Sequence, residues 1–230
     1  MPITDVTQQQ SNAQNQQLHS STSTVSDHSP LGFLLTGLRI AILAADGFEQ
    51  VELTEPKKAL EELGSVTRLL SLGKAPIRGL HHAHPGDLFE VDATFDMVQA
   101  DEFDAVLLPG GKGSAELLQH NPAAQKFVQE IDQQGKPLAV ICHGPLLLAA
   151  AGLLKGKNMT SAPDVRQTIE EAGGLWQDAA VVVDGHWVSS RTPADIPAFN
   201  EAFKKLLAQR TRESVKGTPD DMAAAAATGG

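Results

Sequence analysis

The stretch Pro-Leu-Ala-Val-Ile-Cys-His-Gly-Pro-Leu-Leu-Leu, residues 137–148, predicts a buried strand, a tight turn and a helix in immediate succession. Leu138 to Ile141 is a short apolar run with two β-branched residues, as in strands buried within a parallel sheet. Pro145 is well placed in the first turn of the following helix, where its missing N–H costs nothing. Cys142, the only cysteine of the chain, is therefore expected at a strand-to-helix turn.

The position of Cys142 favours a reactive thiol over a buried core cysteine, which is the common alternative. At the start of a helix the sulfur faces the positive end of the helix dipole and free backbone N–H groups, which lower the pKa of a thiol. The neighbouring His143 and the small Gly144 strengthen this interpretation, because they supply a base and access. We therefore interpret Cys142 as a nucleophile.

Composition limits the class of protein. The chain has 230 residues and a net charge of −10, with a pI near 5.2. The length suits one α/β domain with tails, and the acidic balance argues against a sequence-independent nucleic-acid surface. A single cysteine forms no internal disulfide, which favours a reducing compartment. The sequence shows no secretory signal and no uninterrupted apolar run that spans a bilayer, so we expect a cytoplasmic protein without membrane contact.

The domain is expected over residues 37–210. Residues 1–36 are rich in Gln, Ser and Thr, lack apolar periodicity and are predicted to be a disordered tail. Residues 211–230 contain an alanine run and a closing Gly-Gly, and we expect a second flexible tail there.

Within the domain, apolar runs alternate with helical patterns, which predicts an α/β fold: a doubly wound, mostly parallel sheet sandwiched by helices. A hairpin is expected within 180–189, around Asp184-Gly185. The other expected strands are 38–44, 66–71, 105–108, 138–141 and 158–161, and the expected helices are 51–63, 122–134, 146–151, 165–172 and 194–209.

Residues 77–92 interrupt this alternation and contain His81, His82 and His84. Histidines at such spacing can bind a metal. Here Pro85 and Gly86 flank them and no cysteine lies nearby, so an exposed loop lining the mouth of the site is favoured, and we expect no metal.

Three predicted strands end in residues that suit catalysis. Glu49 follows the first strand, Gly110-Gly111 follows the strand at 105–108, and Cys142-His143 follows the strand at 138–141. Because sites in open parallel sheets form at the carboxyl ends of strands, these residues are expected to converge. Together they provide a nucleophile, a carboxyl group and backbone N–H donors for an oxyanion.

Five separated motifs make residues 38 to about 209 resemble the DJ-1/PfpI superfamily, in particular its PfpI-like intracellular protease and general-stress-protein branch. The resemblance implies a flavodoxin-like fold, related to class I glutamine amidotransferases, with a nucleophile elbow. The motifs are Asp-Gly-Phe-Glu at 46–49, Phe-Asp-Ala-Val-Leu-Leu-Pro-Gly-Gly at 103–111, Ala-Val-Ile-Cys-His-Gly-Pro at 139–145, Val-Val-Val-Asp-Gly-His-Trp-Val-Ser-Ser-Arg at 181–191 and Pro-Ala-Asp-Ile-Pro-Ala-Phe at 193–199.

The resemblance also implies roles for single residues. Cys142 matches the family nucleophile and His143 the adjacent histidine. Glu49 matches the carboxylic acid that hydrogen-bonds the sulfur and shuttles a proton. Gly111 matches an oxyanion donor, together with the N–H of His143, and Glu116 matches the position of an acid that reaches the histidine of a neighbouring subunit. A homodimer or larger homo-oligomer is therefore expected.

The oxyanion and substrate-binding group is completed by Gly110 and Gly144, which flank those donors. The family's activities imply conversion of methylglyoxal to lactate, as in glyoxalase III, and removal of 2-oxoaldehyde adducts from protein, as in a deglycase. In this mechanism Cys142 forms a hemithioacetal, Glu49 moves a proton between adjacent carbons, and hydrolysis releases lactate. No cofactor or metal is expected.

Three alternatives stay open. An intracellular cysteine peptidase needs His143 oriented by a carboxylate, for which Glu116 is the candidate. A non-enzymatic redox sensor needs only an accessible thiol at Cys142. A class I glutamine amidotransferase is the weakest alternative, since no later His-x-Glu completes its triad.

Overall fold

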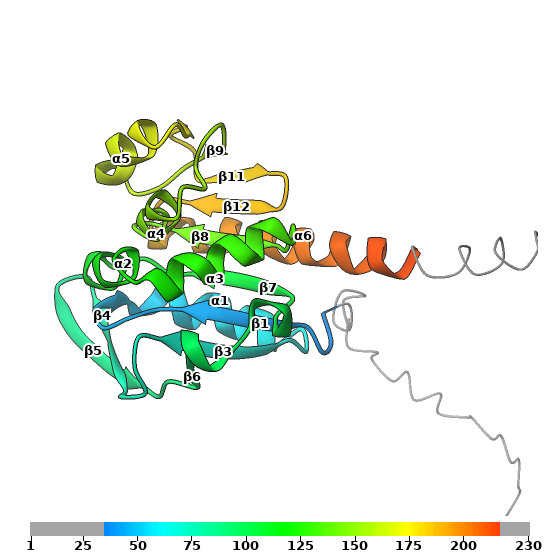
Figure 1. Cartoon of the computed structure of the whole chain (residues 1–230), viewed down its shortest axis with the longest axis horizontal. Coiled ribbons are helices and arrows are strands. Elements are labelled where there is room, and N and C mark those ends of the chain that lie inside the picture. The colour runs from blue at the N-terminus through cyan, green and yellow to red at the C-terminus, as the bar shows by residue number, and fades with distance from the viewer. Residues whose placement is uncertain (1–34, 217–230) are drawn as a thin grey trace, which may run out of the picture.

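The computed structural model describes residues 35–216, with side chains described as far as residue 211. Its main element is a seven-stranded sheet in which each pair of neighbours is parallel except one, β11 and β12, which form an antiparallel hairpin at one edge (Figure 1). The strands, in spatial order, are β11 (Val181–Asp184), β12 (Trp187–Ser190), β8 (Leu138–Ile141), β7 (Ala105–Leu108), β1 (Arg39–Leu43), β3 (Val66–Ser71) and β6 (Ala93–Thr94).

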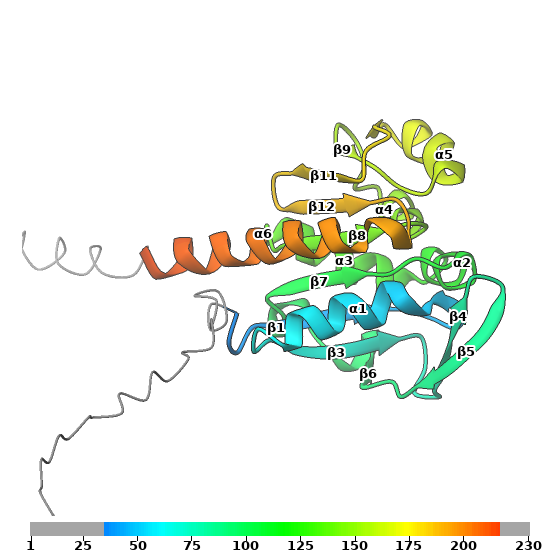
Figure 2. The same cartoon turned by 180° about the vertical axis from the view of Figure 1, so that it is seen from behind.

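Helices cover both faces of this sheet. Helices α2, α3 and α4 lie on the face turned to the viewer in Figure 1, and α1 and α6 lie on the face seen in Figure 2. The helices are α1 (Gln50–Glu61), α2 (Lys112–Gln119), α3 (Pro122–Gln133), α4 (Pro145–Ala150), α5 (Arg166–Glu171) and α6 (Ile196–Lys216). The fold is the expected doubly wound α/β sandwich.

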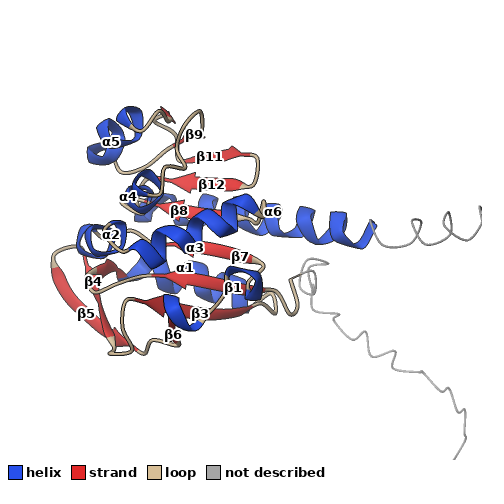
Figure 3. Cartoon of the chain, in the orientation of Figure 1, coloured by secondary structure: helices blue, strands red, loops and turns tan. Residues whose placement is uncertain are grey.

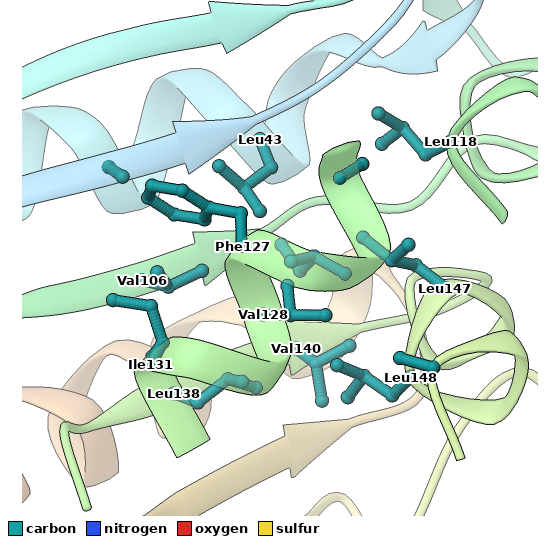
Figure 4. Close-up of a cluster of buried hydrophobic side chains, with 14 of the residues drawn as sticks. Leu43, Val106, Leu118, Phe127, Val128, Ile131, Leu138, Val140, Leu147 and Leu148 are labelled. Atoms are coloured by element: carbon teal, nitrogen blue, oxygen red, sulfur yellow. The ribbon is translucent and has the colours of Figure 1, made fainter. Parts of the chain in front are cut away.

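The core is divided by the sheet into two apolar clusters because successive strand side chains point to opposite faces. In β8, Val140 packs in the cluster beneath α3 and α4, whereas Ile141 packs in the cluster beneath α1 and α6. Figure 4 shows the first cluster, where Phe127 and Ile131 of α3 lie over Val106 of β7. Such burial on both faces makes the central strands continuous apolar runs.

Two smaller sheets extend this framework (Figure 3). The first joins β2 (Phe48–Glu49) to a hairpin of β4 (Ile77–His81) and β5 (His84–Phe89). The second is the parallel pair β9 (Asn158–Met159) and β10 (Leu175–Trp176). The β4–β5 hairpin replaces most of the loop expected over 77–92, and the short strand expected within it lies earlier in the chain.

The last helix extends further than the sequence pattern predicts. Helix α6 continues to Lys216, whereas the apolar face that predicts it ends near Gln209. The domain expected over 37–210 therefore keeps a helical extension at its carboxyl end. Nearly all of the N-terminal tail and most of the C-terminal tail lie outside the described residues.

Candidate active site

Three adjacent strands bring the candidate residues together. Strands β8, β7 and β1 are consecutive neighbours in the sheet. Their carboxyl ends continue into Cys142-His143, Gly110-Gly111 and the segment that leads to β2 and α1. The convergence expected from the sequence is therefore present, and all three strand ends contribute to one cavity.

Cys142 lies on a strained turn between β8 and α4. Its φ of 61° is in the left-handed region, which a residue with a side chain rarely adopts. The turn is fixed from both sides, since the Cys142 amide donates to the Ser190 carbonyl at 3.1 Å and its carbonyl accepts from the Ala162 amide at 3.0 Å. Strain held by its surroundings in this way is typical of a functional residue.

The carboxyl group that contacts the sulfur belongs to Glu52, not to Glu49. Glu52 lies in the first turns of α1 and is fully buried. Its side chain hydrogen-bonds Cys142, and its Oε2 accepts from the Gly110 amide at 2.7 Å. Burial raises the pKa of Glu52 to about 7, so near neutral pH this carboxyl both holds and releases a proton.

Glu49 instead binds the β4–β5 hairpin. Its two carboxylate oxygens accept from the backbone amide of His82 at 3.0 and 3.3 Å. The direction of its side chain follows from the pairing of β2 with β4, in which Glu49 stands opposite Leu80. The assignment of Glu49 as the hydrogen-bond partner of the sulfur was wrong, although Glu49 still lines the same cavity.

The thiol of Cys142 is not intrinsically acidic in this setting. Burial raises its pKa, and the charge of Glu52 raises the pKa further. The amides of Gly111 and His143 contact the sulfur and act in the opposite direction, but they do not outweigh burial. The expectation of a lowered thiol pKa was therefore wrong while Glu52 is ionised, and α4, with six residues, is a short helix. A thiolate becomes favourable when Glu52 is protonated, because the carboxyl is then a neutral donor.

His143 connects the sulfur to a carboxylate of the same chain. Its Nδ1 lies 3.2 Å from Cys142 Sγ, and its Nε2 lies 3.0 Å from Asp164 Oδ2. The hydrogen bond from His143 lowers the pKa of Asp164, so this acid is a carboxylate at neutral pH. The sequence offered Glu116 for this position, and Asp164 was not predicted.

Glu116 points to other partners on α2. Its Oε1 lies 3.5 Å from His120 Nε2, and its Oε2 accepts from Gln119 at 3.0 Å. Within the described chain these are its side-chain contacts.

The backbone N–H groups at the site divide into occupied and open donors. The Gly110 amide is used by Glu52, and the Gly144 amide closes the turn on the Ile141 carbonyl at 3.0 Å. The amides of Gly111 and His143 point at the sulfur. Gly144 matters instead for space, because a Cβ there would lie 2.7 Å from the Val140 side chain.

A cavity of about 280 Å³ opens over the sulfur. Glu52 and Cys142 lie on its buried side, and its other lining residues reach the surface. Its walls are formed by Gly47, Glu49, Glu52, Leu80, His82, Gly111, Lys112, Gly113, Cys142, His143 and Pro193.

Four of the residues at this site escaped the sequence analysis: Glu52, Asp164, His82 as an individual residue, and Lys112. A signal for Glu52 existed, because Glu49 and Glu52 are three residues apart and lie on the same side of a helix. The signal for Asp164 was weaker, since it follows the two-residue strand β9. Among the described residues, no group of three or more His, Cys, Asp or Glu side chains is arranged to hold a metal ion. Over the same part of the chain, every helix is too short or too polar to cross a membrane.

Comparison with known proteins agrees with this geometry. The sequence model of the DJ-1/PfpI family matches residues 38–206. A protein named deglycase from Thermococcus kodakarensis is 44% identical over 170 residues, which are 74% of this chain and 99% of that protein. Deglycase PfpI of Pyrococcus furiosus shows the same identity and coverage. The Bacillus subtilis protein YraA, named as a candidate cysteine protease, is 40% identical over 74% of this chain and 98% of its own length.

Solved structures give the same result. The ThiJ/PfpI domain protein of Brachyspira murdochii superposes with a TM-score of 0.69 at 26% identity, over 75% of this chain and 96% of that one. A protein of Anabaena variabilis with DJ-1/ThiJ/PfpI-like and ferritin-like domains superposes with a TM-score of 0.70 at 33% identity. The match covers 74% of this chain and 48% of that longer one.

Proposed function

This chain belongs to the DJ-1/PfpI family, and we propose that it is a cysteine-dependent, stress-protective enzyme that acts on 2-oxoaldehydes and their adducts. The reactions are conversion of methylglyoxal to lactate and removal of the same group from glycated thiols or amines. The names of the deglycase relatives support the second reaction. Neither reaction requires a cofactor.

The observation that carries the proposal is the buried pair of Glu52 and Cys142. Burial raises the pKa of Glu52 to about 7. A group that moves protons is most effective when its pKa lies near the working pH. A hemithioacetal at the sulfur needs such a group, because one proton must move between two adjacent carbon atoms.

The reaction begins when the Cys142 sulfur adds to the aldehyde carbon and the thiol proton passes to His143 Nδ1, 3.2 Å away. The amides of Gly111 and His143 donate to the oxygen that becomes negative. Glu52 removes the proton from the former aldehyde carbon and returns it to the neighbouring keto carbon, which produces a thioester. Water then cleaves the thioester, releasing lactate and the free thiol.

Asp164 supports the hydrolytic step through His143. Its hydrogen bond to Nε2 leaves Nδ1 directed at the sulfur and stabilises the imidazolium that forms. The same acid supports a second candidate function, peptide hydrolysis. A Cys-His-Asp arrangement within one chain supplies the oriented histidine that a cysteine peptidase needs.

Steady-state assays of methylglyoxal, the N-acetylcysteine hemithioacetal of methylglyoxal and an unmodified peptide test the proposal. We expect turnover of the first two by the wild-type protein and none by Cys142→Ala. Peptide cleavage without aldehyde turnover would replace the first candidate by the second. Aldehyde turnover that survives Cys142→Ala would exclude a cysteine-dependent reaction.

The proposal includes a cytoplasmic location, because a nucleophilic thiol persists in a reducing compartment. It also includes a homodimer or larger homo-oligomer. Helix α2, next to the site, supports this assembly because it presents Leu117 with 46% of its surface exposed, beside Glu116. Sedimentation as a fully active monomer at micromolar concentration would contradict the assembly.

A further inference from the structure

The β4–β5 hairpin is bound tightly to the segment between β1 and α1. The Arg78 amide donates to Asp46 Oδ1 at 2.8 Å. Gln50 forms a reciprocal pair with Asp87, donating to Oδ2 at 2.7 Å and accepting from the amide at 2.8 Å. Glu49 lies between these two anchors and accepts from the amide of His82, at the tip of the hairpin.

His82 has a backbone conformation that requires this support. Its φ of 57° is in the left-handed region, which costs a residue with a side chain roughly 1–2 kcal/mol. The Glu49 carboxylate offsets the strain by accepting from the amide through both oxygens. The conformation directs His82 into the wall of the cavity, so Glu49 determines where the imidazole stands.

The cavity has a buried end and an exposed end. Glu52 is fully buried and hydrogen-bonded to the sulfur, whereas the side chain of His82 is 85% exposed. Lys112, also exposed, lies in the same lining. A free 2-oxoaldehyde that reacts at the sulfur needs only the buried end. An adduct that carries a thiol or amine residue extends outward to the hairpin.

We propose that His82 is a specificity-determining residue that contacts the thiol- or amine-bearing part of an adduct, and that Glu49 is the positioning residue that holds it. This inference rests on the proposed function and narrows its substrate class. The imidazole donates or accepts a hydrogen bond at the outer part of the substrate. It adds affinity for adducts and none for methylglyoxal itself.

The test compares KM and kcat for methylglyoxal and for its N-acetylcysteine hemithioacetal. His82→Gly removes the imidazole, and glycine accepts the left-handed conformation without strain. His84→Ala is the matched control, because it removes another exposed imidazole of the same hairpin that does not line the cavity. Glu49→Ala removes the support of His82, and Glu49→Gln retains one oxygen that accepts from the amide.

We expect His82→Gly to raise KM for the hemithioacetal about fivefold to tenfold, the worth of one hydrogen bond, with kcat and the methylglyoxal constants near wild type. Glu49→Ala should reproduce this pattern, Glu49→Gln should restore part of the affinity, and His84→Ala should match wild type. An equal change for both substrates, or none for either, would overturn the inference. A loss of kcat in Glu49→Gln would overturn the positioning role.

A binding measurement separates this inference from the proposed function. Calorimetry with Cys142→Ala, alone and combined with His82→Gly, measures the affinity for the same hemithioacetal without turnover. If wild type turns over neither aldehyde nor adduct, the proposed function fails. Weaker binding by the double variant would then still support the contact, and equal binding would exclude it.

Discussion

The turn that carries Cys142 and the hairpin that carries His82 each hold one residue at positive φ, but they are supported in different ways. The Cys142 turn lies between central strands, and its residue packs against the apolar clusters of both sheet faces. The hairpin belongs to a peripheral three-stranded sheet, and β5 is largely exposed. Its position depends on polar contacts with Asp46, Glu49 and Gln50.

This difference separates chemistry from recognition. Groups that move protons must be held within a fraction of an ångström, and burial in the core provides that rigidity. A wall that contacts variable parts of a substrate requires less rigidity, and polar anchors at the surface suffice. Changes near Cys142 should therefore reduce kcat, and changes in the hairpin should raise KM or loosen the hairpin alone.

The largest effect is expected from Glu52→Gln. The amide keeps a donor toward the sulfur and an acceptor for the Gly110 amide, but it cannot carry a proton between carbons. Turnover of methylglyoxal should fall about a hundredfold to ten-thousandfold, as measured by steady-state kinetics. Retention of full turnover would remove the distinction between Glu52 and the hairpin acid Glu49.

The same variant has an opposite effect on stability. The folded-state pKa of Glu52 is raised from 4.5 to about 7, so its contribution is fully present below pH 4.5 and lost as pH rises through 7. The loss amounts to at most about 3 kcal/mol. Thermal unfolding should therefore show Glu52→Gln gaining stability over wild type between pH 5 and pH 8. A difference that does not change with pH would contradict the raised pKa.

A smaller effect on the same side of the comparison is expected from Gly110→Ala. A Cβ at this position would lie 2.6 Å from the Cβ of Cys142 and 2.6 Å from Glu52 Oε2. Relief of these contacts displaces the buried pair and costs roughly 1–3 kcal/mol. Chemical denaturation and the rate of iodoacetamide alkylation should both register the change. Gly73→Ala, where a Cβ meets nothing within 4 Å, is the control.

Asp164→Asn should reduce kcat about tenfold, equivalent to about 1.4 kcal/mol. The effect is moderate because 59% of the Asp164 side chain is exposed, compared with 17% for His143. The pH profile should also change, since His143 loses a charged partner and its imidazolium becomes less stable. Glu116→Gln is the comparison variant: an equal or larger loss there would assign the role to an acid from a neighbouring subunit.

The smallest effect is expected from Gln50→Ala in the hairpin anchor. The change removes two hydrogen bonds to Asp87, worth about 1 kcal/mol each. Because the anchor is peripheral, amide exchange should accelerate in residues 77–89 without a change in the β8 amides. Faster exchange in β8 as well would show that the two regions are not independent.

Much of this arrangement could be predicted from the sequence. The apolar run at 138–141, the following proline and the lone cysteine predict the strained turn at Cys142, because each local preference agrees with the fold. The convergence of three strand ends follows from the parallel sheet. The strand–helix alternation also located β1, β3, β7, β8 and the hairpin of β11 and β12.

The choice between Glu49 and Glu52 could not be made this way. It depends on β2 pairing with the β4 segment Ile-Arg-Gly-Leu-His, whose apolar residues do not alternate clearly enough to predict a strand. Asp164 was missed for a related reason. It reaches His143 because the Ala162 amide bonds the Cys142 carbonyl, a contact between loops that no periodicity records.

The contact of Cys142 with both apolar clusters gives the sulfur an influence on the whole domain. A group attached to it, whether an acyl intermediate, an oxidised sulfur or an alkyl label, alters the packing on the two faces of the sheet together. The cooperative unfolding transition of the protein therefore reports the covalent state of one atom. Because the chain contains a single cysteine, a change in the melting curve after treatment with a thiol reagent has one origin.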